Sequence, residues 1–195
     1  MRRWRTAWSP GSGSRSSWAS ICIVAALTAA AFAPLAAQAD AISVPPQPAL
    51  ALASGPWLNG ATTTLAAQKG KVVVLLFWTR DCINCKHNLG YWNGWSKKYN
   101  GTDVAVLSVH TPETRFERTS AATARFAREH DLRFPILVDN ESRVWNIYGV
   151  QSWPTGILID EQGRIRAEFA GELNWENSGE YKTVGRQIEA LHAEG

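Results

Sequence analysis

Cysteine is scarce in this chain of 195 residues: Cys22, Cys82 and Cys85 are the whole set. So small a number excludes a small fold held together by a framework of disulfides. Cys22 lies at the start of an apolar run near the N-terminus, whereas Cys82 and Cys85 lie two residues apart in the stretch FWTRDCINCKH. That spacing raises four readings: a redox couple, half of a metal site, a haem attachment site, or two core residues that happen to be close.

Acidic residues are absent from the first 39 residues, which hold four arginines. An apolar run from Ile21 to Leu35 follows the arginines, and Ala37-Gln38-Ala39 has the small-x-small pattern of a signal cleavage site before Asp40. An uncleaved anchor is the alternative, but about 17 apolar residues interrupted by Pro34 are short for a span of roughly 20. We therefore expect residues 1–39 to be a cleavable signal peptide and the protein to be periplasmic or otherwise extracytoplasmic.

Excess positive charge is missing once that segment is set aside. The full chain has 20 Lys+Arg and 17 Asp+Glu, so removing the four arginines leaves 16 against 17, a net charge of −1. No attraction to nucleic acid or to anionic lipid is therefore expected. Cys22 would leave with the signal, and the remaining two cysteines suit a single redox pair in an oxidising compartment.

The rest of the chain divides into a lead-in and one domain. Residues 40–56 contain Val44-Pro45-Pro46-Gln47-Pro48 and Ser54-Gly55-Pro56, which favour a Pro-rich linker. Residues 57–195 are enough for a single domain and contain no internal repeat.

Hydrophobic patterns in that domain predict alternating strands and helices. Strands are expected at 71–78, 104–109, 134–138, 156–160 and 165–169, and helices at 83–99, from 111 to about 130, at 142–148 and at 181–192. The first three strands would be parallel, and the last two would form an antiparallel hairpin. This order predicts an α/β sandwich with a mixed sheet.

The cysteine pair falls where the first buried strand ends and a helix begins. Unpaired amide groups and the positive end of the helix dipole gather there, and both favour a thiolate over a thiol. A lowered thiol pKa makes a cysteine a nucleophile for disulfide exchange. We expect Cys82 to be the exposed attacking residue and Cys85, one turn into the helix, to be the buried resolving residue.

Other roles for the pair fit the sequence less well. A c-type haem site needs His directly after the second cysteine, where this chain has Lys86. A structural zinc site needs two more ligands at suitable spacing, and the four histidines form no second pair, so no metal or cofactor is expected. Copper-delivery proteins usually place three residues between their cysteines. Thr79-x-x-Cys82 is similar to a peroxidatic site, but Leu75 stands where a proline normally lies. Two inert core cysteines are the remaining alternative.

The segment Lys71–Cys85, together with Trp153-Pro154-Thr155, resembles the thioredoxin superfamily, in particular its exported TlpA/ResA-like branch. The stretches FWTRDCINCKHNLGYW and VLSVHTPETRFE are most similar to the thioredoxin-like domain of DipZ-type proteins, and the similarity runs from about residue 65 to 171. It implies a thioredoxin-like three-layer α/β/α sandwich, with a cis Pro154 facing the cysteines as part of the catalytic site. Trp78, Trp153 and Thr155 are the candidates for a surface that binds client proteins.

Two positions depart from the thioredoxin pattern. Thioredoxin has a buried Asp just before the Phe-Trp of its active-site strand, and this chain has Leu76 there. Glu113 and His110, at the end of the second strand, are the candidates for proton transfer in its place. Asp81 directly precedes Cys82, and a neighbouring carboxylate raises the pKa of a thiol. We therefore expect a pair that is less oxidising than its position alone would give.

The resemblance implies an exported thiol:disulfide oxidoreductase that reduces disulfides of client proteins. Cytochrome c maturation, with apocytochrome c as a client, and a membrane electron donor of the DsbD/CcdA kind are the implied setting. Two alternatives stay open. One is a thiol peroxidase, and the other is a redox-silent binding module that uses the Trp78 and Trp153 surface.

Overall fold

The structure is a computed structural model that describes residues 47–52, 55–60 and 62–195. The expected signal peptide and the first part of the expected linker lie outside the described residues. Within the described part of the chain, no helix is both long enough and apolar enough to cross a membrane.

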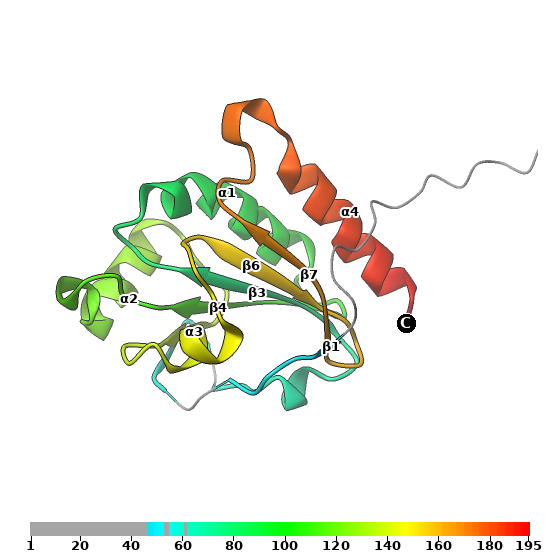
Figure 1. Ribbon diagram of the computed structural model, residues 1–195, viewed down its shortest axis with the longest axis horizontal. Coiled ribbons are helices and arrows are strands. Elements are labelled where there is room, and N and C mark those ends of the chain that lie inside the picture. Colours follow the sequence, from blue (N-terminus) through cyan, green and yellow to red (C-terminus); the bar gives the residue numbers. More distant parts are fainter. Residues whose placement is uncertain (1–46, 53–54, 61) are drawn as a thin grey trace, which may run out of the picture. The chain divides into compact units, whose positions relative to one another are not determined.

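The described residues form a mixed sheet of seven strands in the order β1-β7-β6-β3-β4-β5-β2 (Figure 1). The strands are β1 (Gln47–Pro48), β2 (Trp57–Leu58), β3 (Val72–Trp78), β4 (Val104–His110), β5 (Ile136–Val138), β6 (Thr155–Ile159) and β7 (Arg164–Ala170). Strands β3, β4 and β5 are parallel, while β6 and β7 form an antiparallel hairpin. The predicted fold class and the parallel-then-antiparallel order are confirmed.

Strand β3 lies at the centre of the sheet because its sequence is apolar on both faces. All seven of its residues are buried, which is the pattern of a parallel strand covered on both sides. Its last residue, Trp78, pairs with His110 at the end of β4, and Phe77 pairs with Thr155 at the start of β6. The ends of β3 and β4 and the beginning of β6 therefore meet at one edge of the sheet.

Helices cover the two faces of the sheet unequally. They are α1 (Ile83–Lys98), α2 (Ser120–Glu129), α3 (Arg143–Tyr148) and α4 (Glu180–Ala193), with short 3-10 helices η1 (Ala66–Gln68), η2 (Arg115–Glu117) and η3 (Trp175–Asn177). Buried residues of α1, α2 and α4 pack with Val72, Val74 and Leu76 on one face. Val144 of α3 packs with Val73 and Leu75 on the other face, and Figure 1 shows α3 on the opposite side of the sheet from α1 and α4. The three layers predicted from the sequence are present.

The helix expected from residue 111 to about 130 begins later than predicted. The chain first makes the short helix η2, and α2 starts only at Ser120, after Thr119 in an extended conformation. A capping box marks the start of η2, where Thr114 and Glu117 exchange side-chain-to-backbone hydrogen bonds. The break follows at Thr119, whose extended backbone (φ −85°, ψ 106°) separates η2 from α2.

The lead-in segment contributes to the sheet. Gln47–Pro48, which lie within the expected linker, pair with Ile165 and Arg164 of β7 at one edge. Trp57–Leu58 pair with β5 at the other edge. Between them Leu52 is buried in the cluster that α3 covers, so this segment crosses that face of the sheet.

Candidate active site at the start of helix α1

The cysteine pair occupies the turn that joins β3 to α1. Strand β3 ends at Trp78, and Cys82 is the N-cap of α1, with extended backbone angles (φ −69°, ψ 118°). The Sγ of Cys82 accepts a hydrogen bond from the backbone N–H of Cys85 at 3.2 Å. A sulfur therefore takes the position in which an oxygen side chain usually caps a helix. Both cysteines are free thiols.

Cys82 is partly exposed and has the properties of an attacking thiol. A hydrogen bond with the Cys85 side chain is the largest influence, and the backbone amides of Cys85 and Asn84 add to it. Together they lower the pKa of Cys82 to about 7, against burial and the charge of Glu113, which act in the opposite direction. A substantial fraction of Cys82 is therefore thiolate at neutral pH, the form that attacks a disulfide.

Cys85 lies in the opposite environment one turn further along the helix. Its side chain is 1 % exposed and belongs to the core cluster between β3 and α1. Burial raises its pKa far above the ordinary value, and the hydrogen bond with Cys82 acts in the same direction. Cys85 therefore stays protonated when Cys82 ionises. The partial exposure of Cys82 and the burial of Cys85 match the predicted environments, while their roles as attacking and resolving residue stay a prediction.

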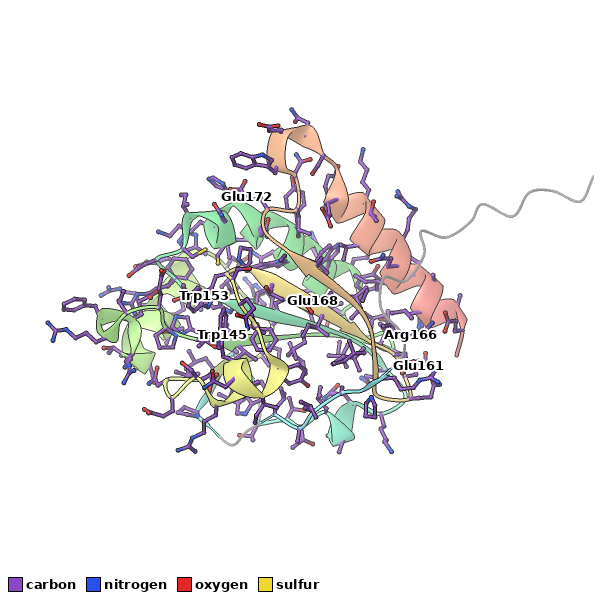
Figure 2. All side chains as sticks on the ribbon, in the orientation of Figure 1. Trp145, Trp153, Glu161, Arg166, Glu168 and Glu172 are labelled. Atoms are coloured by element: carbon purple, nitrogen blue, oxygen red, sulfur yellow. The ribbon has the colours of Figure 1, made fainter. Side chains whose placement is uncertain are left out.

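The loop before β6 brings an aromatic pair next to this site. The Trp153–Pro154 peptide bond is cis, as the resemblance implied. Trp153 is half-buried and packs against the same core cluster as Cys82. Its ring stacks on that of Trp145 from α3, with 4.2 Å between centroids and 27° between planes (Figure 2). The two tryptophans form an apolar platform. Of this pair, the sequence predicted only Trp153 as part of a client-binding surface.

Two residues expected on the client surface lie in the interior. Trp78 is fully buried, and its indole N–H donates to the Ser108 hydroxyl at 3.1 Å. Thr155 is 2 % exposed, and its hydroxyl donates to the carbonyl of Ser152 at 2.9 Å. The assignment of Trp78 and Thr155 to a surface is therefore wrong, because β3 and β6 are central strands covered on both faces.

The two candidates for proton transfer differ in their surroundings. Glu113 is exposed, and its negative charge raises the pKa of Cys82. His110 is fully buried with its ring edge-on to Trp78, and burial lowers its pKa to about 4, so it is neutral at pH 7. Neither ring nitrogen of His110 has a hydrogen-bond partner among the described residues. Proton transfer by Glu113 or His110 stays a prediction.

Asp81 is not among the groups that shift the pKa of Cys82, the residue that it precedes. Its side chain is 60 % exposed and lies 3.6 Å from the guanidinium of Arg80. The carboxylate that opposes ionisation of Cys82 is that of Glu113, which arrives from the loop after β4. The effect expected from Asp81 therefore comes from another residue.

One buried carboxylate at this site, that of Glu117, was not predicted from the sequence. It is fully buried and accepts hydrogen bonds from the Thr79 hydroxyl and from the backbone N–H of Asp81, the latter at 3.0 Å. The spacing Thr114-x-x-Glu117 was the available signal, because a Ser or Thr followed three residues later by Glu is the pattern of a capping box.

Asn88 and Glu172 tie the segment after β7 to α1. The buried Asn88 side chain donates to the carbonyl of Gly171 and accepts from the N–H of Leu173, both at 2.9 Å. Glu172, at the top of Figure 2, lies 2.9 Å from His87 of α1. No cluster of three or more His, Cys, Asp or Glu side chains that could hold a metal ion occurs in the part of the chain that the structure describes.

Comparisons with known proteins agree with this geometry. The AhpC/TSA family matches residues 46–168. Protein DipZ of Mycobacterium tuberculosis is 36% identical over 135 residues, which are 68% of this chain and 19% of DipZ. The thiol-disulfide oxidoreductase ResA of Bacillus cereus is 33% identical over 124 residues, which are 64% of this chain and 69% of ResA.

A solved structure gives the same picture. The thiol-disulfide isomerase of Corynebacterium glutamicum is 25% identical with a TM-score of 0.66, and the match covers 76% of this chain and 97% of that one. The chain spans about a fifth of the DipZ proteins, so it corresponds to one part of them. With a CxxC motif capping the helix after the central strand and a cis proline before β6, the chain belongs to the thioredoxin-like AhpC/TSA family.

Proposed function

We propose that this protein is an exported thiol:disulfide oxidoreductase that reduces disulfides of client proteins through the Cys82–Cys85 couple. One observation carries the proposal: the sulfur of Cys82 caps α1 with its pKa lowered to about 7, while Cys85 is buried and protonated beside it. An ionised nucleophile next to a protonated partner is what two-step disulfide exchange requires.

The exchange follows from the positions of the two sulfurs. The Cys82 thiolate attacks one sulfur of a client disulfide, the client S–S bond breaks, and a bond between Cys82 and the client forms. The released client sulfur takes up a proton. Cys85 then loses its proton to solvent and attacks Cys82, which releases the second client thiolate and leaves a Cys82–Cys85 disulfide. The client gains two electrons, and the protein loses two.

Several parts of the proposal rest on the resemblance and on relatives. ResA relatives are named thiol-disulfide oxidoreductases, which supports the activity for this chain. We expect removal of residues 1–39 on export, and N-terminal sequencing of the exported protein should begin at or near Asp40. A membrane donor of the DsbD/CcdA kind would return electrons to the pair. Apocytochrome c is a candidate client, recognised beside the Trp145–Trp153 platform and Pro154.

The reduction potential of the Cys82–Cys85 couple tests the direction of the reaction. We expect a value in the reducing half of the range between about −270 mV, as in thioredoxin, and about −120 mV, as in a strong oxidant. Equilibration with glutathione or dithiothreitol buffers, followed by alkylation of free thiols, measures it. A potential above roughly −160 mV would mean that the protein oxidises its clients instead.

Two other functions are separated from this one by direct assays. A thiol peroxidase would consume hydrogen peroxide in the presence of a dithiol donor. Thr79, which begins the Thr-x-x-Cys pattern, directs its hydroxyl to Glu117, which does not support that role. A redox-silent binding module would show no disulfide exchange and would keep its binding when both cysteines are replaced by serine.

A further inference from the structure

The segment that joins β7 to α4 begins beside the candidate active site. We call residues 171–180 the Trp175 segment; in Figure 1 it forms the orange loop at the top of the molecule. Its first N–H, that of Gly171, donates to the carbonyl of Pro154 at 2.8 Å. Pro154 is the cis residue that precedes β6. The segment therefore starts at the loop that also carries Trp153.

Two residues of α1 hold the segment against the beginning of that helix. The buried Asn88 side chain bonds the backbone on both sides of Glu172, and Leu173 is 1 % exposed. His87 lies 2.9 Å from a carboxylate oxygen of Glu172. At 1.5 Å per helical residue, these contacts lie within about 9 Å of Cys82 along the axis of α1. A client chain that reaches Cys82 with its disulfide therefore passes close to the segment.

Trp175 is exposed although the backbone around it is fixed. The residue is 60 % exposed. Its carbonyl accepts from the N–H of Ser178 at 2.8 Å, and the Asn174 side chain accepts from the N–H of Gly179 at 3.0 Å. An exposed tryptophan on a preformed backbone costs little ordering entropy on binding, and tryptophan is a frequent anchor of protein interfaces. Trp175 therefore has the properties of a contact residue for another chain.

Negative charge surrounds this exposed indole. Residues 171–181 contain three glutamates and no Lys or Arg. Glu176 and Glu180 are exposed, and neither forms an ion pair with a residue that the structure describes. Lys182, the next basic residue, lies over the Tyr181 ring, 5.6 Å from its centroid. An aromatic face beside carboxylates attracts Lys and Arg side chains and repels acidic segments.

A second exposed aromatic residue near the cysteines has the opposite surroundings. Phe116 of η2 is 71 % exposed, and the guanidinium of Arg115 lies 4.9 Å from the centroid of its ring. The side chain of Arg80, in the turn before Cys82, donates to the carbonyl of Phe116 at 2.6 Å. Phe116 is therefore tied to the same active-site turn but lies beside cations. It offers a matched comparison for Trp175.

We propose that the Trp175 segment binds a positively charged stretch of a client protein next to the client's disulfide, with a Lys or Arg side chain over the indole of Trp175. This inference rests on the function proposed above and adds the class of client: chains with basic residues beside their disulfide. The glutamates of the segment supply the attraction, and the fixed backbone limits the entropy lost on binding. The segment acts on how tightly a client binds and leaves the exchange steps as described.

Three synthetic peptides test this inference. They share one intramolecular disulfide and are flanked on both sides by three lysines, three serines or three glutamates. Single-turnover reduction by the pre-reduced full chain, quenched with acid, is followed against protein concentration, which separates binding from bond exchange. At low protein concentration, the lysine peptide should react about tenfold faster than the glutamate peptide, with the serine peptide between them. Raising the salt from about 0.1 M to about 1 M should remove most of this preference, because the screening length falls from about 10 Å to about 3 Å.

Substitutions in the full chain locate the effect. Trp175→Ala should slow reduction of the lysine peptide about two- to fivefold, the value of one exposed cation–π contact. The loss should appear as a higher half-saturating protein concentration. Glu176→Gln combined with Glu180→Gln should remove most of the preference for lysine over glutamate. Phe116→Ala, which removes an equally exposed ring, is the matched control and should leave that preference unchanged.

The inference is overturned if the lysine and glutamate peptides react equally at low salt, or if Phe116→Ala abolishes the preference as fully as the glutamate substitutions do. Sedimentation of the wild-type protein adds another test. A dimer that Trp175→Ala converts to a monomer would assign this surface to a second copy of the chain and would also overturn the inference.

Failure of the proposed function would look different, because no peptide would then be reduced. Fluorescence anisotropy of labelled peptides with serine in place of cysteine measures binding to the full chain without any exchange reaction. Tighter binding of the lysine peptide would support the docking surface even then, and equal binding of the lysine and glutamate peptides would refute it.

Discussion

Cys82 and Cys85 have opposite environments although two residues separate them. Cys82 caps α1 and is partly exposed, whereas Cys85 is 1 % exposed within the core cluster. One helical turn is enough to produce this difference, because the first sulfur meets the free amides of the helix start and the second faces the sheet. The structure therefore places the two sulfurs in unequal environments, which supports the separate roles proposed for them.

Replacing the cysteines one at a time tests these roles. Cys85→Ala should leave attack by Cys82 intact but remove resolution, so covalent adducts with client proteins should accumulate and disappear on addition of dithiothreitol. Cys82→Ala should trap almost no client, because the remaining sulfur is buried and protonated. Adducts are measured on non-reducing gels, and insulin reduction should be lost in both variants.

The outcome of this experiment distinguishes a wrong assignment of the cysteine roles from a wrong function. Equal trapping by Cys82→Ala and Cys85→Ala would show that the roles of the sulfurs are assigned wrongly. If neither variant traps a client and the wild-type pair does not oxidise reversibly, the oxidoreductase itself would be the wrong function. A binding module that uses the Trp145–Trp153 platform would then explain the fold better.

For single residues, the sequence predicted properties that depend on neighbours along the chain better than properties that depend on residues brought together by folding. The unequal burial of Cys82 and Cys85 followed from their position at a strand-to-helix junction. Burial of Trp78 was not visible, because an aromatic residue at a strand end suits a core as well as a surface. The buried carboxylate of Glu117 was missed because it contacts Thr79, in the turn before the cysteines, from a segment more than thirty residues further along the chain.

At the scale of elements, the glycines of α1 and β6 differ in whether a larger side chain would fit in their place. Gly90 and Gly94 lie on exposed positions of α1, and an added Cβ at either would meet nothing within 4 Å. At Gly156, a Cβ would lie 2.0 Å from the ring of Phe169 on the neighbouring strand β7. Only Gly156 is required by a close approach.

These positions make a matched pair of substitutions. Gly94→Ala should stabilise the protein by about 0.5–1 kcal/mol, because alanine loses less conformational freedom in a helix. Gly156→Ala should destabilise it by about 1–3 kcal/mol, because Phe169 must leave its position in a packed core. Urea unfolding of both variants against wild type measures the changes. A neutral Gly156→Ala would show that the β6–β7 face repacks freely.

The elements most accurately predicted were those with long, regular patterns. Strand β3 and helix α1 match their predicted ranges to within a residue or so, because an apolar run and a three- and four-residue repeat are local signals. The start of α2 was misplaced because Pro112 suits a first helical turn, while the extended backbone at Thr119 separates η2 from α2. Edge strands β1 and β2 carry two residues each, too few for a pattern.

For the whole molecule, the lead-in segment behaves as part of the domain. Leu52 is 9 % exposed and packs in the cluster of Val73, Leu75 and Phe77. The Tyr148 hydroxyl of α3 donates to the carbonyl of Leu50. The residues expected to act as a linker therefore contribute to the core on the α3 face.

Truncating Leu52 measures that contribution. Leu52→Ala should lower the free energy of unfolding by about 2 kcal/mol, at the lower end of the cost of removing a buried leucine side chain. Leu50→Ala is the control: its side chain is 45 % exposed, so a change within about 0.5 kcal/mol is expected. Equal effects in chemical denaturation would mean that the segment only spans the surface.

The same segment also determines which edge strands of the sheet could pair with strands of other chains. Strand β1 pairs along the outer side of β7, and β2 along that of β5. Among the residues that the structure describes, both edges of the sheet therefore end in strands of two residues. Pro48 in β1 has no N–H to offer. Long, unpaired edge strands can pair with strands of other molecules and so promote aggregation, whereas short edge strands with few free N–H groups do so much less. If the protein reduces partly unfolded client chains as proposed, these short edges would keep it from joining them in an aggregate.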